Sequence, residues 1–353
     1  MAECPDPLAV LAAYPAVVRP TRLLALGGAG GFSGARFWRA EAEAGPYCLR
    51  RWPADYPGPA ELRFIHAVLR HARERGFCLA PVPLEARGGQ PYVSRGGHLW
   101  ELSPWMPGKA DFAASPTAPR LKAAAACLAE FHRAVEDLCW TGSSSGPGAT
   151  RGEGPSPGIA HRLAVLREWL TVRARLLHDA LAGPAAWPEI ADRAERVLKL
   201  LPRAAPAVYD QLASVQRHRV PLQPCLGDIW HDHLLYQGDR VTGLVDFGAM
   251  RWDNVSCDLA RLLGSLAGSN RALWEVGVSA YEAVRPVSEA ERNLANAFDV
   301  SGLLLGALNW ASWTILDGRV FEEPCAVLQR MDDLIARLET LQFDIPNRRG
   351  LVL

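Results

Sequence analysis

Two aspartates, Asp228 and Asp246, lie eighteen residues apart within residues 225–248 and are the side chains best suited to chemistry. Phosphoryl transfer uses such a pair, because one carboxylate orients the attacking hydroxyl and another holds Mg²⁺ against the triphosphate. A histidine, His233, lies between them in the sequence. This stretch therefore predicts a phosphotransfer site, provided that the fold brings these side chains together.

The residues between the two aspartates predict a β-hairpin. Two apolar runs, Leu234–Tyr236 and Val241–Val245, flank the turn residues 237–240, which contain Gly and Asp. Short apolar runs joined by such a turn are typical of two antiparallel strands. The hairpin would bring both aspartates and His233 towards the same end of a two-stranded ribbon. A polar hairpin in an ordinary α+β domain is the alternative interpretation.

Gly227-Asp228 and Asp246-Phe247-Gly248 resemble the catalytic and metal-binding segments of one family of small-molecule kinases. That family contains the aminoglycoside phosphotransferases, choline kinases and homoserine kinases, which are relatives of protein kinases. The resemblance implies that Asp228 is the catalytic base, that Asp246 is the main Mg²⁺ ligand, and that ATP is the cofactor. Asp258 resembles the family's structural aspartate that hydrogen-bonds the backbone of the catalytic loop. A carboxylate at a helix N-terminus is the simpler reading of Asp258.

Two positions depart from the family pattern. Leu226 stands where the family has a loop histidine, and His233 stands where it has a metal-binding asparagine. Mg²⁺ prefers oxygen ligands, and imidazole is a poor replacement for an amide oxygen. His233 is therefore predicted as a ligand that suits Mn²⁺ as well as Mg²⁺, or as a hydrogen-bond partner of Asp228 or a phosphate. The departures also leave open a site that has lost its second metal or its catalysis.

A glycine-rich turn between two predicted strands is the candidate phosphate-binding loop. Glycines allow backbone N–H groups to approach phosphates closely, although a flexible turn in a β-meander is equally consistent with them. Arg50, in the following strand, stands where the family has a lysine for the α- and β-phosphates, and arginine can bind phosphate bidentately. The helix glutamate that pairs with this lysine in the family aligns with Ile65, and Glu61 lies one turn earlier. The predicted loop residues are Gly28, Gly30, Gly31, Phe32 and Ser33.

Residues 99–108 resemble the strand and inter-lobe hinge of the same family, ending in Pro107-Gly108. The resemblance implies that adenine takes backbone hydrogen bonds near Ser103, Trp105 and Met106. An aromatic strand packed into the core is the alternative, and the two interpretations are compatible.

The family resemblance implies an α+β, protein-kinase-like fold with two lobes. Residues 1–103 are predicted as a β-rich nucleotide-binding lobe with one helix, and residues 104–353 as a helical lobe that carries the catalytic hairpin. Within the second lobe, residues 141–158 are rich in Ser, Gly and Pro and predict a flexible loop. Apolar periodicity predicts helices over these ranges: 59–74, 159–182, 188–201, 206–217, 289–316 and 324–341.

The composition narrows the classes of function. The 353 residues include 38 basic and 38 acidic side chains, so charge gives no support to a nucleic-acid or membrane-surface role. The cysteines lack Cys-x-x-Cys spacing and the start lacks a signal-peptide pattern, which predicts a cytoplasmic protein with reduced thiols. The uncharged stretch 300–316 is predicted as a buried helix, because it contains polar residues and is short for a membrane span.

The sequence therefore predicts an ATP-dependent phosphotransferase that moves the γ-phosphate to a hydroxyl of an unidentified small metabolite. A catalytically inactive, kinase-shaped protein that binds a nucleotide or metabolite is the alternative. A protein kinase is disfavoured, because no Ala-Pro-Glu segment follows Asp246.

Overall fold

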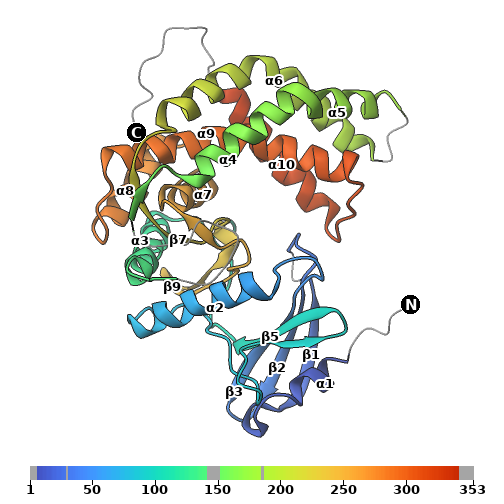
Figure 1. Cartoon of the computed structure of the whole chain (residues 1–353), viewed down its shortest axis with the longest axis vertical. Coiled ribbons are helices and arrows are strands. Elements are labelled where there is room, and N and C mark those ends of the chain that lie inside the picture. The colour runs from blue at the N-terminus through green and yellow to red at the C-terminus, as the bar shows by residue number, and fades with distance from the viewer. Residues whose placement is uncertain (1–5, 29–30, 141–151, 184–186, 342–353) are drawn as a thin grey trace. The chain divides into compact units, whose positions relative to one another are not determined.

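The computed structural model describes residues 6–28, 31–140, 152–183 and 187–341 (Figure 1). The chain forms two compact units, residues 1–150 with 231–250 and residues 151–230 with 251–353. Each unit is thus built from two separate pieces of the chain. The predicted lobe boundary after residue 103 lies inside the first unit, and that division of the chain stays a prediction.

The first unit contains a five-stranded antiparallel sheet with the strand order β1-β2-β3-β5-β4. The sequence predicts its first three strands, because turns that contain glycine separate them. Ala42 pairs with Gly45 across a two-residue turn, which fixes the register between β2 and β3. The strands are β1 Pro20–Gly27, β2 Arg36–Ala42, β3 Gly45–Arg51, β4 Val93–Arg95 and β5 His98–Pro104.

Helices cover this sheet and connect it to the hairpin of the same unit. Val10 and Tyr14, from and just after the short helix α1 (Pro7–Leu11), pack with Leu49 and Trp100 in a buried cluster. Helix α2 (Pro59–Glu74) has the predicted bounds, with proline at its start and a buried apolar face. Helix α3 (Ala118–Val135) begins at the cap Thr117, whose side chain accepts a hydrogen bond from the Arg120 N–H. These contacts give the first unit its core.

The predicted β-hairpin is confirmed and belongs to the first unit. Strand β8 (Leu234–Gln237) pairs with β9 (Arg240–Leu244) across Gly238 and Asp239, with a register shift after Leu235. Gly108 packs against this hairpin with φ +106°, and a Cβ there would lie 2.4 Å from the Thr242 Oγ1. Only glycine fits this position, so the chain after β5 can press closely against the hairpin.

The second unit contains a small antiparallel sheet in the order β10-β7-β6. The strands are β6 Gly152–Gly154, β7 Val220–Cys225 and β10 Arg251–Asp253. The prediction of a loop over 141–158 is wrong for residues 152–158, since these form β6 and the start of helix α4 (Pro157–Glu168). Ser156 explains the helix start, because its hydroxyl accepts a hydrogen bond from the Ile159 N–H. Residues 141–151 of the predicted loop lie outside the described residues.

Helices make up the rest of the second unit. The prediction of two helices over 188–201 and 206–217 is wrong, because Pro188–Val215 is one helix, α6, that contains Pro202 and Pro206. An interior proline costs about 3 kcal/mol, but the buried stripe runs unbroken through Leu201, Ala205 and Val208 and packs α6 against α9. Burial therefore outweighs the local preference of proline. The other helices are α5 Ala174–Leu181, α7 Ser256–Ala267, α8 Arg271–Glu282, α9 Glu289–Ala311 and α10 Pro324–Thr340.

The stretch 300–316 is largely buried and helical, as predicted, at the end of α9 and in the π-helical turn Ser312–Leu316. Among the described residues, no helix combines the length and the apolar character that crossing a membrane requires. The cysteines of the described residues are free thiols.

Candidate active site

Asp246 lies in the first unit, in the loop that follows β9, beside two basic side chains. The Arg50 Nη2 donates a hydrogen bond to the Asp246 Oδ1 at 3.1 Å, and the His233 Nε2 lies 3.7 Å from the Oδ2. Burial raises the pKa of Asp246, but the charges of Arg50 and His233 and hydrogen bonds from Arg50 and Gly248 outweigh it. The pKa is therefore lowered, and the group is a carboxylate at neutral pH.

The backbone at Asp246 adopts a conformation that non-glycine residues rarely take, with φ +63°. Such a conformation costs about 1–3 kcal/mol and persists where the surrounding structure enforces it. Here the surroundings are specific, since the Val245 N–H donates to the His233 carbonyl at 2.9 Å. This bond closes the ribbon one residue before Asp246, which turns the carboxylate towards Arg50. Strained backbone of this kind is typical of functional loops.

Arg50 lies on β3 and is 8% exposed. Its guanidinium carbon lies 3.3 Å from the centre of the Trp52 ring and 5.2 Å from that of Phe37. A Cβ on Gly248 would lie 3.0 Å from Trp52 and 3.4 Å from the Arg50 Nη2. The absent side chain at Gly248 thus leaves room for the stacked arginine to reach Asp246.

The side chains around Asp246 fit a magnesium ion held by one protein carboxylate. Mg²⁺ commonly takes one or two carboxylates and completes its octahedron with water and substrate phosphates. Asp246 supplies the ionised oxygen ligand, and its side chain is 42% exposed. His233 adds an imidazole nitrogen, which suits Mn²⁺ better than Mg²⁺. The structure thus brings His233 and Asp246 together, as the hairpin predicts.

Asp228 lies in the second unit, in the loop after β7, and its side chain is 55% exposed. The Arg261 Nε, from α7, donates a hydrogen bond to the Asp228 Oδ1 at 2.9 Å. The Trp230 ring has the guanidinium of Arg261 at 4.5 Å and that of Arg330 at 3.7 Å. An exposed carboxylate held in one orientation is free to accept a proton from an approaching hydroxyl. Its meeting with Asp246 stays a prediction.

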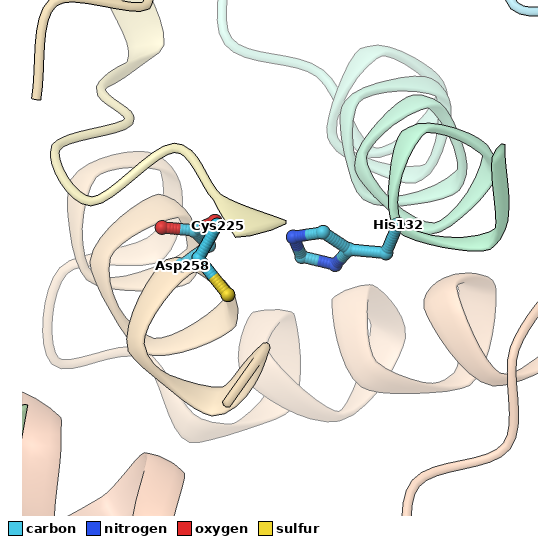
Figure 2. Close-up of side chains that lie close together, drawn as sticks. All are labelled: His132, Cys225 and Asp258. Carbon is cyan, nitrogen blue, oxygen red and sulfur yellow. The ribbon is translucent and has the colours of Figure 1, made fainter. Parts of the chain in front are cut away.

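Asp258 holds the loop that presents Asp228. One carboxylate oxygen accepts from the Leu226 N–H at 2.6 Å and the other from the Gly227 N–H at 2.8 Å. Figure 2 shows Asp258, on α7, beside Cys225 at the end of β7. Buried backbone N–H groups need acceptors, so a fully buried carboxylate fixes the two residues before Asp228. Asp258 therefore makes the hydrogen bonds to the loop backbone that the family resemblance implies.

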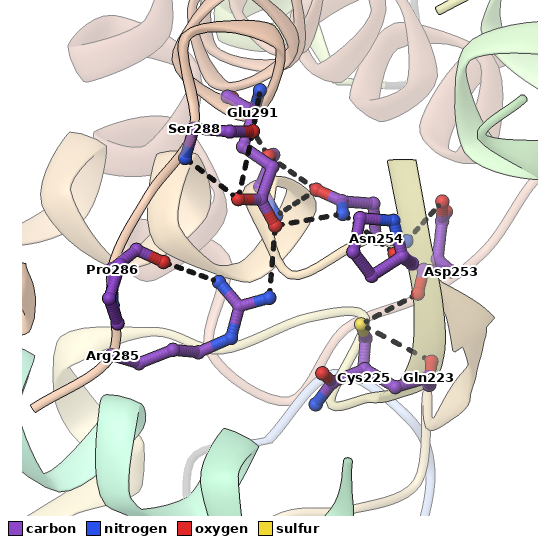
Figure 3. A network of polar contacts seen from close by, with 10 residues as sticks. Gln223, Cys225, Asp253, Asn254, Arg285, Pro286, Ser288 and Glu291 are labelled. Atoms are coloured by element: carbon purple, nitrogen blue, oxygen red, sulfur yellow. Dashed lines mark hydrogen bonds and ion pairs between the residues drawn. The ribbon is translucent and has the colours of Figure 1, made fainter. Parts of the chain in front are cut away.

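A buried polar network supports the segment that leads into α7 (Figure 3). The Asn254 Nδ2 donates to the Pro221 carbonyl at 2.8 Å and to the Glu291 Oε1 at 3.2 Å. The Arg285 Nη2 donates to the same Glu291 oxygen at 3.0 Å. Each of these polar side chains is buried and partnered, which makes the arrangement rigid. The network therefore fixes α7, and with it Asp258.

The nucleotide-binding residues expected from the sequence all belong to the first unit. In the glycine-rich turn, the Gly31 N–H donates to the Gly28 carbonyl at 2.9 Å, and the Ala35 N–H lies 3.4 Å from the Ser33 Oγ. Gly27 has a positive φ of +61°. The turn thus connects β1 to β2 and includes Phe32, whereas Gly30 lies outside the described residues.

The expected hinge residues differ in what their backbones offer. Ser103 is buried and pairs with Cys48 in the sheet. The Trp105 N–H donates to the Pro46 carbonyl at 3.0 Å, so this donor is already used. Among the described residues the Met106 N–H meets no acceptor. Met106 is therefore the hinge residue whose backbone donor is available to a ligand.

A sequence profile of the phosphotransferase enzyme family matches residues 26–292, which is most of the chain. The chain belongs to the phosphotransferase enzyme family. This confirms the family resemblance on which the sequence prediction rests. The match includes both aspartates, Arg50 and the glycine-rich turn.

Individual relatives agree with this family. A homoserine kinase of Methylobacterium sp. (strain 4-46) is 29% identical over 149 residues, 38% of this chain and 46% of that enzyme. The match thus spans about half of the relative's length. An aminoglycoside phosphotransferase from Alicyclobacillus acidocaldarius superposes with a TM-score of 0.58 at 18% identity, covering 95% of this chain and 93% of that one.

A spectinomycin phosphotransferase solved with ADP and spectinomycin gives a TM-score of 0.61 at 10% identity, with 90% and 92% of the two chains covered. At these identities the likeness concerns the fold. It confirms a protein-kinase-like fold with a small antiparallel lobe and a larger, mostly helical lobe.

Sequence reasoning missed three neighbours of the candidate site residues. Arg261 contacts Asp228, Trp52 stacks on Arg50, and Trp230 carries the Arg261 guanidinium. Trp52, two residues after Arg50, and Trp230, two residues after Asp228, are the signal that was available, since arginine stacks readily on indole. The pairing itself depends on tertiary packing.

Proposed function

We propose that the protein is an ATP-dependent phosphotransferase that moves the γ-phosphate to a hydroxyl of a small metabolite. The observation that carries the proposal is the contact between an ionised Asp246 and Arg50, on a strand next to the glycine-rich turn. Phosphoryl transfer places a metal-binding carboxylate and a phosphate-binding cation next to one another. The family match supports the reaction class.

In the proposed reaction Asp228 orients the acceptor hydroxyl and accepts its proton as the new O–P bond forms. Arg261 and Asp258 keep Asp228 in place, one through the carboxylate and the other through the loop backbone. Arg50 exchanges its contact with Asp246 for the phosphate oxygens, and Met106 donates its N–H to adenine. Asp246 holds Mg²⁺, which when bound neutralises charge on the phosphates. His233 stays beside Asp246 and favours turnover with Mn²⁺ as well.

Catalysis in this proposal rests on positioning and charge. The protein supplies preorganised groups. The bond between the γ-phosphorus and the ADP oxygen breaks, and a bond between the γ-phosphorus and the acceptor oxygen forms. The acceptor is a small hydroxyl-bearing molecule. The relatives are named for homoserine and for aminoglycosides, so both classes belong in a first substrate screen.

A kinase-shaped binding protein without turnover is the second candidate. Two observations favour it. Leu226 is buried and apolar where the family has a histidine, and an imidazole replaces the second metal-binding amide at His233. Such a protein would bind nucleotide and leave every acceptor unmodified.

One experiment separates the two candidates. ADP release is followed with ATP and Mg²⁺ or Mn²⁺ against homoserine, amino alcohols and aminoglycosides, beside thermal shifts with and without each metal. Metal-dependent stabilisation by ATP together with acceptor-dependent ADP release supports the enzyme. Stabilisation by ATP without ADP release from any acceptor supports the binding protein, and no response to ATP contradicts both.

A further inference from the structure

A buried carboxylate lies next to Arg50 on the neighbouring strand. Glu101, on β5, is 8% exposed, and its Oε2 lies 2.7 Å from the Nε2 of His66, which is 1% exposed on α2. Burying a charged group costs free energy unless it is paired and hydrogen-bonded. A buried ion pair of this kind is weak evidence for a gain in folding stability, which leaves room for a role of His66 and Glu101 in the neighbouring site.

Glu101 carries its charge beside Arg50. The two residues are directly opposite in the β3–β5 ladder, and the Cβ atoms of such partners lie about 4.5–5.5 Å apart. Burial raises the pKa of Glu101, but the His66 hydrogen bond and the charges of His66 and Arg50 outweigh it. The pKa is therefore lowered, and Glu101 is an anion at neutral pH.

Arg50 needs a second source of alignment. Its one direct ion pair among the described residues is with Asp246, and its Nε meets no hydrogen-bond partner there. When the guanidinium leaves Asp246 for a phosphate, the rings of Trp52 and Phe37 still lie against it, and among its described neighbours Glu101 supplies the negative charge that orients it. Ile65, on the face of α2 that belongs to the core, is apolar and 2% exposed, so it supplies no charge.

We propose that Glu101, held and kept charged by His66, is the positioning residue for Arg50 and sets how tightly the protein binds the phosphates of ATP. The inference rests on the proposed function, because it assigns phosphate binding to Arg50. The pair also connects α2 to the strand beside Arg50, because His66 on α2 is hydrogen-bonded to Glu101 on β5. The carboxylate that aligns the phosphate-binding cation thus comes from a strand, and the helix contributes its hydrogen-bond donor.

The first test is Glu101→Gln, which keeps the shape and an oxygen acceptor for His66 but removes the charge. We expect the Kd for ATP, measured by calorimetry, and the KM for ATP to rise about tenfold, with kcat changed less than about threefold. A pair that only locks α2 to the sheet would lower the Tm and leave Kd and KM unchanged. That result would overturn the proposal.

A double-mutant cycle shows whether Glu101 acts through Arg50. In an Arg50→Met background the same Glu101→Gln change should alter the Kd for ATP less than about twofold. An equal tenfold rise in both backgrounds would mean that the two residues act independently, which contradicts the proposal.

His66 offers variants that do not depend on Glu101→Gln being folded. His66→Gln keeps a donor for the carboxylate and should bind ATP like the original protein. His66→Leu leaves the buried carboxylate without its donor, so the Tm should fall and Kd should rise as in Glu101→Gln. Equal Kd values for the two His66 variants would overturn the proposal.

Glu291→Gln is the matched control, because Glu291 is a buried carboxylate paired with Arg285 in the second unit. It should lower the Tm and leave the Kd for ATP unchanged. If the original protein binds no ATP, the failure lies with the proposed function. If it binds ATP and Glu101→Gln does so equally well, only the positioning role fails.

Discussion

The two candidate aspartates, Asp246 in the first unit and Asp228 in the second, have different surroundings. Asp246 lies on strained backbone and touches a buried arginine, and a histidine lies 3.7 Å away. Asp228 lies on a loop whose backbone N–H groups are hydrogen-bonded to Asp258, and the side chain of Asp228 is more than half exposed. Both side chains are partly exposed, 42% for Asp246 and 55% for Asp228. Asp246 faces a buried arginine and a histidine, whereas Asp228 pairs with Arg261 on a loop that Asp258 supports.

This difference separates two chemical tasks. A metal ligand has to stay ionised, and neighbouring cations ensure this by lowering the pKa of Asp246. A base has to reach a substrate hydroxyl, so its orientation matters more than its burial. In the proposed function the same residue type thus takes two roles that its neighbours determine, and substitutions at the neighbours should separate these roles.

The largest effect is expected from Asp228→Asn, which removes the proposed base and keeps the shape. General-base catalysis contributes about 10²–10⁴ in rate, so kcat should fall by that factor while the Kd for ATP and the Tm stay unchanged. Steady-state kinetics and calorimetry measure these quantities. Asp210 is an exposed aspartate on α6, so Asp210→Asn is the matched control and should leave kcat, the Kd for ATP and the Tm unchanged. A parallel loss of ATP binding in Asp228→Asn would remove the distinction between the two aspartates.

Asp258→Asn should damage the support of Asp228. An asparagine has one acceptor oxygen for the two N–H groups of Leu226 and Gly227, and its NH₂ would face the other donor. The loss of a buried acceptor costs about 1–3 kcal/mol, so the urea midpoint should fall and kcat should drop with it. Asp299→Asn, which disturbs the half-buried pair with Arg337 in the same unit, should lower stability and spare kcat. An unchanged kcat in a destabilised Asp258→Asn would show that the loop needs no anchor.

The sequence was sufficient where a local pattern determines the structure. Short apolar runs on either side of the turn at Gly238 predicted the hairpin, and the apolar stripe of 59–74 predicted α2 with its bounds. It failed where packing outweighs local preference. Pro202 and Pro206 suggested a break, but the buried stripe of α6 continues through both.

The candidate site shows the same division. Short motifs mark Asp228, Asp246 and Arg50 as candidates, and their functional roles stay predictions. The partners that orient them could not be predicted, since Arg261 is 33 residues from Asp228 and Glu101 is 35 residues from His66. Such pairs form only when distant elements pack, and a single sequence carries no local signal for them.

A smaller effect is expected at Arg261, which orients Asp228 directly. Arg261→Met keeps an unbranched side chain and removes the guanidinium, which lies over Trp230 and donates the hydrogen bond to the carboxylate. The pair is exposed, so its contribution is about 1 kcal/mol at most, which equals about a fivefold loss of kcat. The Tm should stay within error. Arg175→Met, which removes the exposed contact of Arg175 with Asp179, should leave kcat unchanged. A kcat for Arg261→Met equal to that of this control would show that the loop alone orients Asp228.

The smallest effect concerns the charge around Asp246 and has a defined pH dependence. Because its folded-state pKa lies below the usual 3.8, the ionised group stabilises the folded state above that pH. The contribution is lost as pH falls through the lower, folded-state pKa. The side chain is 42% exposed, so solvent screening limits the contribution to about 0.2–1 kcal/mol. Asp246→Asn should therefore unfold at a lower urea concentration than the original protein at pH 7.

The difference between the two proteins should shrink as pH falls from 4 towards 2. Burial alone would give the opposite sign, because it raises the pKa of a carboxyl group. Arg50→Met sharpens the measurement, since removal of the neighbouring cation should reduce the pH dependence that Asp246 contributes. A difference that stays constant from pH 7 to pH 2 would mean that Arg50 and His233 do not hold Asp246 in its ionised form, which would remove the proposed difference in charge between the surroundings of Asp246 and Asp228.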